Sequence, residues 1–409
     1  MNSKSKPSPH LLPVDGVRLA TVAAGIKKSG YDDLLLIELG PASQVAAVFT
    51  ENRFAAAPVE LCREYLQLAQ PRYLLINSGN ANCGLGSAGL DAARVCCQAV
   101  ADAADVELQT VLPFSTGVIA EPLPAEKIVT AIPALLKGLD KGHWIAGADA
   151  IRTTDTVAKG GSRTVDIDGT AVTITGICKG SGMIRPNMAT MLAYIATDAL
   201  VAAEALQPLL NRAVNKSFNC ISVDGDMSTN DACLLITTGE AGNPVLDPAD
   251  SAVALQWAKF EQAVTDLCIE LAQSIIRDGE GASKFITIEI RGADSDQDAR
   301  AVATAVAHSP LVKTAFFASD ANWGRILAAV GYAQVEHLDI GKVEIFLGDV
   351  CIVRDGARAH EYEEAAGAAV MVQSDITLMI NLHSGTSHID FWTCDLSYDY
   401  VRINAEYRT

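Results

Sequence analysis

The stretch KGSGMIRPNMATML, residues 179–192, determines how the rest of this chain is interpreted. It contains glycines typical of a turn, a proline that fixes φ, and the small residue Ala189 directly before Thr190. This pattern would let the Thr190 hydroxyl reach the Ala189 carbonyl and cut the bond between them. Cleavage would make Thr190 an N-terminal nucleophile whose own α-amino group acts as the base. The alternative interpretation is a glycine-containing hairpin that leads into a buried strand.

Such a cleavage needs hydrogen-bond donors for an oxyanion, and the stretch PFSTGVI at residues 113–119 offers a Ser-Thr-Gly turn. The Gly117 N–H and the Thr116 hydroxyl would stabilise the tetrahedral intermediate, an effect of about 3 kcal/mol per donor. An ordinary turn is the alternative. The seven histidines form no recognisable Ser/His/Asp arrangement. An N-terminal amine, with a pKa of about 7.7 to 8, would supply the base that the histidines do not.

Composition predicts a soluble globular protein with no attraction to polyanions. Hydrophobic residues make up 49% of the 409 residues, and the formal net charge of −18 disfavours nucleic acid and anionic membranes as partners. No apolar run is long enough for a membrane span and residues 1–13 lack a signal core, so we expect a cytoplasmic protein. The ten cysteines form no CxxC pair, which favours buried free thiols. We expect no metal, because Asp224 to Leu235 lacks the glycine and glutamate of a calcium loop.

Hydrophobic periodicity predicts an α+β fold, with mixed sheets packed against helices in two or three lobes. Expected strands are 33–39, 45–50, 73–77, 164–177, 192–195, 234–238, 285–291, 343–353 and 376–383. Expected helices are 90–104, 125–137, 202–216, 252–277 and 296–306. The polar segment 292–300 is the best candidate for a boundary between lobes.

Several further motifs, together with residues 179–192, resemble the ornithine acetyltransferase family of arginine biosynthesis along nearly the whole chain. These motifs are Asn77–Asn82, Ser115–Gly117, Thr153–Thr156, Asp278–Lys284, Asp320–Arg325 and Asn404–Thr409. Ala120 and Ala321 depart from residues that are frequent in that family, glycine and proline respectively, and neither position carries chemistry.

The resemblance implies a self-processing fold of the type that has an N-terminal threonine nucleophile, as in the ornithine acetyltransferase and aminopeptidase superfamily. It implies cleavage between Ala189 and Thr190 into segments 1–189 and 190–409, which form one intertwined unit. Thr190 would be the nucleophile, and Thr116 and Gly117 would stabilise the oxyanion. The substrate contacts that the resemblance implies are Thr153 or Thr154, Lys179, Thr190, Glu280, Asn404 and Thr409.

Some of these residues have ordinary alternatives. Lys179 and Glu280 would otherwise be interpreted as solvated surface charges, and Asn404 and Thr409 as a frayed tail. The resemblance implies instead that Glu280 pairs with a substrate ammonium group, that Lys179 neutralises a carboxylate, and that an ordered tail closes the site.

The implied enzyme is a glutamate N-acetyltransferase. It would move the acetyl group of N2-acetylornithine to Thr190 and then to glutamate, in a ping-pong reaction that requires no cofactor. Whether acetyl-CoA is a second donor stays open. The family further implies a heterotetramer with two copies of each segment. Two alternatives also stay open: a self-processing aminopeptidase or amidase that passes the acyl group to water, and an uncleaved protein without enzymatic activity.

Overall fold

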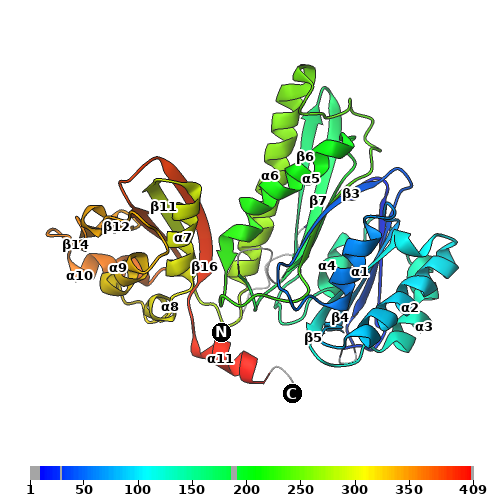
Figure 1. The fold of residues 1–409 in the computed structure, drawn as a ribbon, viewed down its shortest axis with the longest axis horizontal. Helices are drawn as coiled ribbons and strands as arrows, with labels where there is room; N and C mark the ends of the chain where they lie inside the picture. Colours follow the sequence, from blue (N-terminus) through cyan, green and yellow to red (C-terminus); the bar gives the residue numbers. More distant parts are fainter. Residues whose placement is uncertain (1–9, 28–29, 186–190, 407–409) are drawn as a thin grey trace. The chain divides into compact units, whose positions relative to one another are not determined.

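The computed structural model describes residues 10–27, 30–185 and 191–406, and it divides the chain into two compact units. Unit 1 comprises Met1–Asn219 and Asp226–Ile275, and unit 2 comprises Cys220–Gly225 and Ile276–Thr409. Both units contain sheets covered by helices (Figure 1), which confirms the predicted α+β class. Segment 292–300 lies inside unit 2, where it connects a strand to a helix.

Unit 1 contains a four-stranded sheet that is buried on both faces. Its order is β1 (Val17–Val22), β2 (Leu34–Leu39), β4 (Tyr73–Asn80) and β5 (Val111–Val118), with β4 and β5 parallel. The continuous apolar run of β2 fits this position, because successive side chains of a strand point to opposite faces. Leu34 and Leu36 pack in the core cluster that contains residues of α2 (Ser87–Ala104) and α3 (Ala125–Lys137).

The opposite face of that sheet shares a core with a second, five-stranded sheet. Leu35 and Ile37 of β2 join residues of α1 (Ala57–Tyr65), α4 (Trp144–Ala150) and the second sheet in one buried cluster. The second sheet has the order β3 (Gln44–Phe49), β10 (Ala232–Thr237), β8 (Leu192–Thr197), β7 (Thr170–Lys179) and β6 (Lys159–Ile167).

The helices α5 (Ala203–Asn215) and α6 (Ala254–Arg277) pack against this second sheet. The Cys178 thiol of β7 donates to the Leu271 carbonyl of α6 over 3.7 Å, and Glu270 of α6 forms an ion pair with Arg163 of β6. Strand β8, the first element after residue 190, therefore lies at the centre of a sheet that is covered by helices.

Two of the expected strands are wrong in extent, because each is a hairpin. The run 164–177 is the pair β6 and β7, which turns at Asp168 (φ 53°) and Gly169 (φ 84°). The run 343–353 is β12 (Glu344–Leu347) and β13 (Val350–Arg354), which turn at Gly348 (φ 55°). Apolar residues on both sides of each turn gave a continuous pattern. The backbone reverses at two residues with positive φ in the first turn and at one glycine with positive φ in the second.

Unit 2 is built on a seven-stranded sheet in the order β14-β13-β12-β15-β11-β16-β9. The remaining strands are β14 (Ala357–Arg358), β15 (Asp375–Asn381), β11 (Phe285–Ala293), β16 (Ser387–Cys394) and β9 (Ile221–Ser222). Its helices are α7 (Asp296–Ala307), α8 (Pro310–Phe317), α9 (Trp323–Gly331), α10 (Glu364–Met371) and α11 (Tyr398–Ala405). Strand β11 lies inside the sheet and pairs in parallel with β15 and antiparallel with β16.

The cysteines are free thiols, nine of them buried and Cys351 half-buried, as predicted. Burial raises the pKa of Cys96 and of Cys178 to about 12 in each case, so their reactive thiolate forms are scarce at neutral pH. We expect a thiol-specific reagent at pH 7 to modify at most Cys351 in the native protein and all ten cysteines after unfolding. Rapid modification of a second thiol in the native protein would contradict this burial.

Candidate active site

Thr116 and Gly117 lie near the end of strand β5, where they pair with the end of the parallel strand β4. Ser78 is opposite Thr116, and Gly79 is opposite Gly117. Gly117 has φ +137°, and an added Cβ would lie 2.3 Å from the Gly79 carbonyl carbon, so only glycine fits. The prediction of a Ser-Thr-Gly turn was therefore wrong in its local structure: the apolar run continues as a strand through both residues.

Lys179, the last residue of β7, reaches this strand end. Its Nζ donates a hydrogen bond to Thr116 Oγ1 over 3.1 Å, and both residues are buried. Two of the residues implied by the family resemblance, 63 positions apart, are thus in direct contact. The contact places a buried positive charge beside the expected oxyanion donors, where it would favour developing negative charge.

Asp155 connects Lys179 to the loop that carries Thr153. Its Oδ1 accepts hydrogen bonds from Lys159 Nζ over 2.6 Å and from the Gly180 amide over 2.7 Å, and its Oδ2 accepts from the Thr153 amide over 3.1 Å. Burial by itself would raise the pKa of Asp155, but Lys159 and Lys179 hold that pKa well below its usual range. Asp155 was not among the predicted site residues. Its position inside the motif 153–156, four residues before a lysine, was the available signal.

Lys27 was also missed by the sequence analysis. Its Nζ donates to the carbonyl oxygens of Ala150, over 3.2 Å, and Arg152. Its side chain passes over Gly79, where an added Cβ would come within 2.7 Å of Lys27 Cγ. Burial lowers the pKa of Lys27 to about 8, with Lys179 and Arg152 acting in the same direction and Asp33 opposing them. No sequence signal could have found this contact, because Lys27 binds backbone carbonyls more than 120 residues away.

Glu280 and Asn404 lie together in unit 2. Asn404 Nδ2, from α11, donates to Glu280 Oε2 over 2.7 Å, and Glu280 is only 7% exposed. The Ser397 hydroxyl before α11 donates to the Gly281 carbonyl over 2.6 Å. These contacts attach α11 to the glycine-containing turn that carries Glu280.

The predicted site residues therefore form two groups, each described within its own unit. In unit 1, the contacts bring together Thr116, Gly117 and Lys179. Asp155 connects this group to Thr153, and the neighbouring Thr154 is half-buried. Glu280 and Asn404 come together in unit 2. Ala189, Thr190 and Thr409 lie outside the described residues.

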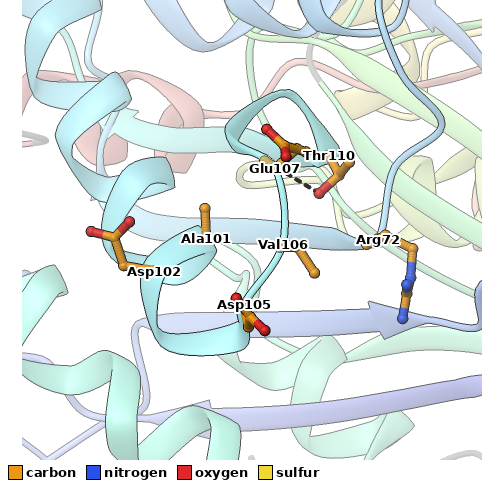
Figure 2. A pocket seen from close by; sticks show the side chains of 7 residues that line it. All are labelled: Arg72, Ala101, Asp102, Asp105, Val106, Glu107 and Thr110. Atoms are coloured by element: carbon orange, nitrogen blue, oxygen red, sulfur yellow. Dashed lines mark hydrogen bonds between the residues drawn. The ribbon is translucent and has the colours of Figure 1, made fainter.

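A separate pocket of about 540 Å³ lies in unit 1 at the end of α2 (Figure 2). Its carboxylates are Asp102, Asp105 and Glu107, and Arg72 lies at its opposite side. The Thr110 hydroxyl donates to the Glu107 carbonyl over 2.7 Å. None of the predicted site residues lines this pocket, and its carboxylates are not arranged around a buried nucleophile. We therefore place the candidate site at the ends of β5 and β7 instead.

Within residues 10–27, 30–185 and 191–406, no group of three or more His, Cys, Asp or Glu side chains could hold a metal ion. In the same ranges, no helix has the length and apolar character needed to cross a membrane.

Comparisons with known proteins agree with these motifs. The ArgJ family profile matches residues 18–409. The arginine biosynthesis bifunctional protein ArgJ of Pseudomonas syringae pv. tomato is 53% identical over 403 residues, which covers 98% of each chain. Its counterpart from Methylococcus capsulatus is 54% identical over 400 residues, which covers 98% of this chain and 97% of the relative.

Two solved structures also match part of the chain. The crystal structure of arginine biosynthesis bifunctional protein argJ from Bacillus halodurans has 40% identity and a TM-score of 0.49, covering 52% of this chain and 98% of that one. The structure of ornithine acetyltransferase complexed with ornithine from Mycobacterium tuberculosis has 32% identity and a TM-score of 0.37, covering 42% of this chain and 92% of that one.

Proposed function

The chain belongs to the ArgJ family, and we propose that Thr190, freed by self-cleavage, carries the acetyl group in its reaction. As a member of this family, the protein is an acyltransferase of arginine biosynthesis, a glutamate N-acetyltransferase. The alternatives of a self-processing hydrolase and of an uncleaved binding protein are not favoured.

One observation carries the role of Thr190. Strands β7 and β8 are antiparallel neighbours, and Lys179 pairs directly with Leu192. Thr190 lies two residues before Leu192, and two residues of fully extended chain span at most about 7 Å. Thr190 is therefore connected, within this distance, to a residue that pairs with the end of β7, where Lys179 contacts Thr116. This proximity supports a nucleophile that reacts beside the Thr116 and Gly117 donors.

The proposed chemistry has two stages. First, the Thr190 hydroxyl attacks the Ala189 carbonyl, an ester forms, and water releases segments 1–189 and 190–409. Next, the freed α-amine of Thr190 removes the hydroxyl proton, the oxygen attacks the acetyl carbonyl of N2-acetylornithine, and ornithine leaves. Glutamate then attacks the acetyl-threonine to give N-acetylglutamate. The Gly117 amide and the Thr116 hydroxyl stabilise the oxyanions that form in these attacks.

The substrate contacts are proposed in the same way. Lys179 neutralises a substrate carboxylate, the Glu280 carboxylate binds the ammonium group of ornithine, and Thr153 or Thr154, Asn404 and Thr409 complete the site. Acetyl-CoA is proposed as a second donor, since the curated relatives are named bifunctional. We further propose a cytoplasmic heterotetramer of two copies of each segment.

A donor comparison tests the proposed reaction. Purified protein is incubated with N2-acetylornithine in the presence and absence of glutamate, and in parallel with acetyl-CoA and glutamate. We expect ornithine and N-acetylglutamate in equal amounts, with parallel double-reciprocal plots for a ping-pong reaction. Ornithine release without N-acetylglutamate, as acetate appears, would identify a hydrolase instead. N-acetylglutamate formed from acetyl-CoA and glutamate, in the absence of N2-acetylornithine, would establish the second donor.

Glu280→Gln tests the contact to the ornithine ammonium group. The amide keeps a hydrogen-bonding oxygen for Asn404 but removes the negative charge, so we expect kcat/KM for N2-acetylornithine to fall about 10- to 100-fold. Initial rates measured against donor concentration give this value. Glu289→Gln is the matched control, because Glu289 also lies in unit 2 but pairs with Arg291. Equal activities of the Glu280 variant and the control would exclude the proposed contact.

A further inference from the structure

We propose that the Asp155 carboxylate is the positioning group of this active site, which fixes Lys179 and the Gly180 amide relative to the Thr153 loop. This inference rests on the proposed function, because it assigns a role within the same reaction. Asp155 does not contact Thr116 itself. It acts through the elements that it joins.

The contacts of Asp155 connect three separate segments. One oxygen binds the side chain of Lys159, at the start of β6, and the amide of Gly180, just after β7. The other oxygen binds the Thr153 amide. Gly180 is the first residue after Lys179, so the carboxylate binds the backbone directly after the end of β7.

Stability alone does not explain a carboxylate at this place. The side chains of Lys159 and Asp155 are 1% and 0% exposed, and a buried ion pair of this kind is often no more stable than an apolar pair of similar volume. The two backbone amides that Asp155 binds differ from the ion pair in this respect, because they belong to the segments that carry Thr153 and Lys179. Apolar side chains could replace the ion pair, but they could not hold these amides.

This difference allows fold and function to be separated by mutation. Asp155→Asn alone leaves the buried Lys159 charge without its carboxylate, and we expect Tm to fall by roughly 10 °C. The double variant Asp155→Asn/Lys159→Met removes both charges and should recover most of that Tm. If Asp155 positions the site, kcat/KM for N2-acetylornithine in the double variant stays about 100-fold below the wild-type value, because small misplacements of this kind are costly.

The matched control is Asp198→Asn. Asp198 is also buried, and its carboxylate accepts a hydrogen bond from the Thr173 amide over 2.7 Å, in the half of β7 away from Lys179. This variant should lose stability without losing more than about twofold in kcat/KM, because the bond it weakens lies away from Lys179.

The decisive measurement is Tm and kcat/KM for all four proteins, with the appearance of the two segments followed by mass. Recovery of both Tm and activity in the double variant would overturn the inference. So would a double variant that stays as unstable as Asp155→Asn, since the carboxylate would then serve the fold itself. Wild-type protein that transfers no acetyl group would instead refute the proposed function, and the two failures are therefore distinguishable.

Discussion

We expect Thr190→Ala to leave the protein as one chain of 43.1 kDa and to abolish acetyl transfer. The variant lacks the hydroxyl that attacks Ala189, and without the cut it also lacks the α-amine that would act as base. Mass spectrometry after prolonged incubation at neutral pH, together with an ornithine release assay, checks both parts. This is the largest effect that we expect from a single substitution.

Thr190→Ser is the matched control for that variant. Serine keeps the hydroxyl and, once the bond is cut, the adjacent amine, so we expect cleavage and measurable acetyl transfer at reduced rates. If Thr190→Ala still splits between residues 189 and 190, or still produces ornithine, then Thr190 is not the nucleophile.

Gly117→Ala should reduce acetyl transfer by about 10³-fold, comparable with the loss of an oxyanion donor. The new Cβ would overlap the Gly79 carbonyl carbon, so the ends of β4 and β5 must separate and the Gly117 amide must move. Steady-state kinetics of the purified variant measure the loss.

Gly169→Ala separates the collision from the backbone strain. Gly169 also has positive φ, in the turn between β6 and β7, but an added Cβ there would meet no atom within 4 Å. This control should lose about 1 kcal/mol of stability and keep its activity within about twofold. Similar activity losses in the two variants would show that strain, and not the close approach to Gly79, explains the effect.

The sequence predicted those parts of the fold where local pattern and burial agree. The helix expected at 125–137 is α3 in both bounds, and its apolar residues Ile128, Ile132 and Leu135 are buried on one face. Prediction failed where a short turn interrupts an apolar run, as at Asp168 and Gly169. The sequence contains the Asp-Gly pair of a hairpin turn, but residues with high β propensity on both sides made the run resemble one continuous strand.

The candidate site was predictable only in part, and for a different reason. Thr116 and Gly117 were predicted from the stretch 113–119 itself, and Lys179 through the family resemblance. In the structure, Lys179 Nζ donates to Thr116 Oγ1, beside Gly117. Asp155 and Lys27 act through contacts with the backbone of distant segments, namely the Gly180 amide and the Ala150 and Arg152 carbonyls. Such contacts do not depend on the identity of the partner residue. The sequence therefore offers only the position of Asp155 four residues before a lysine, and no signal for Lys27.

The central position of β8 has a consequence for how the protein would refold after the proposed cleavage. This strand begins just after the proposed cut, and it pairs with β7 on one side and β10 on the other. In the uncut chain, the pairing of β7 with β8 is intramolecular. If the chain is cut there, the same pairing would join two separate polypeptides, so recovery from unfolding would become a second-order encounter that slows on dilution. The precursor would therefore refold readily, whereas the mature enzyme would depend on slow unfolding for its persistence.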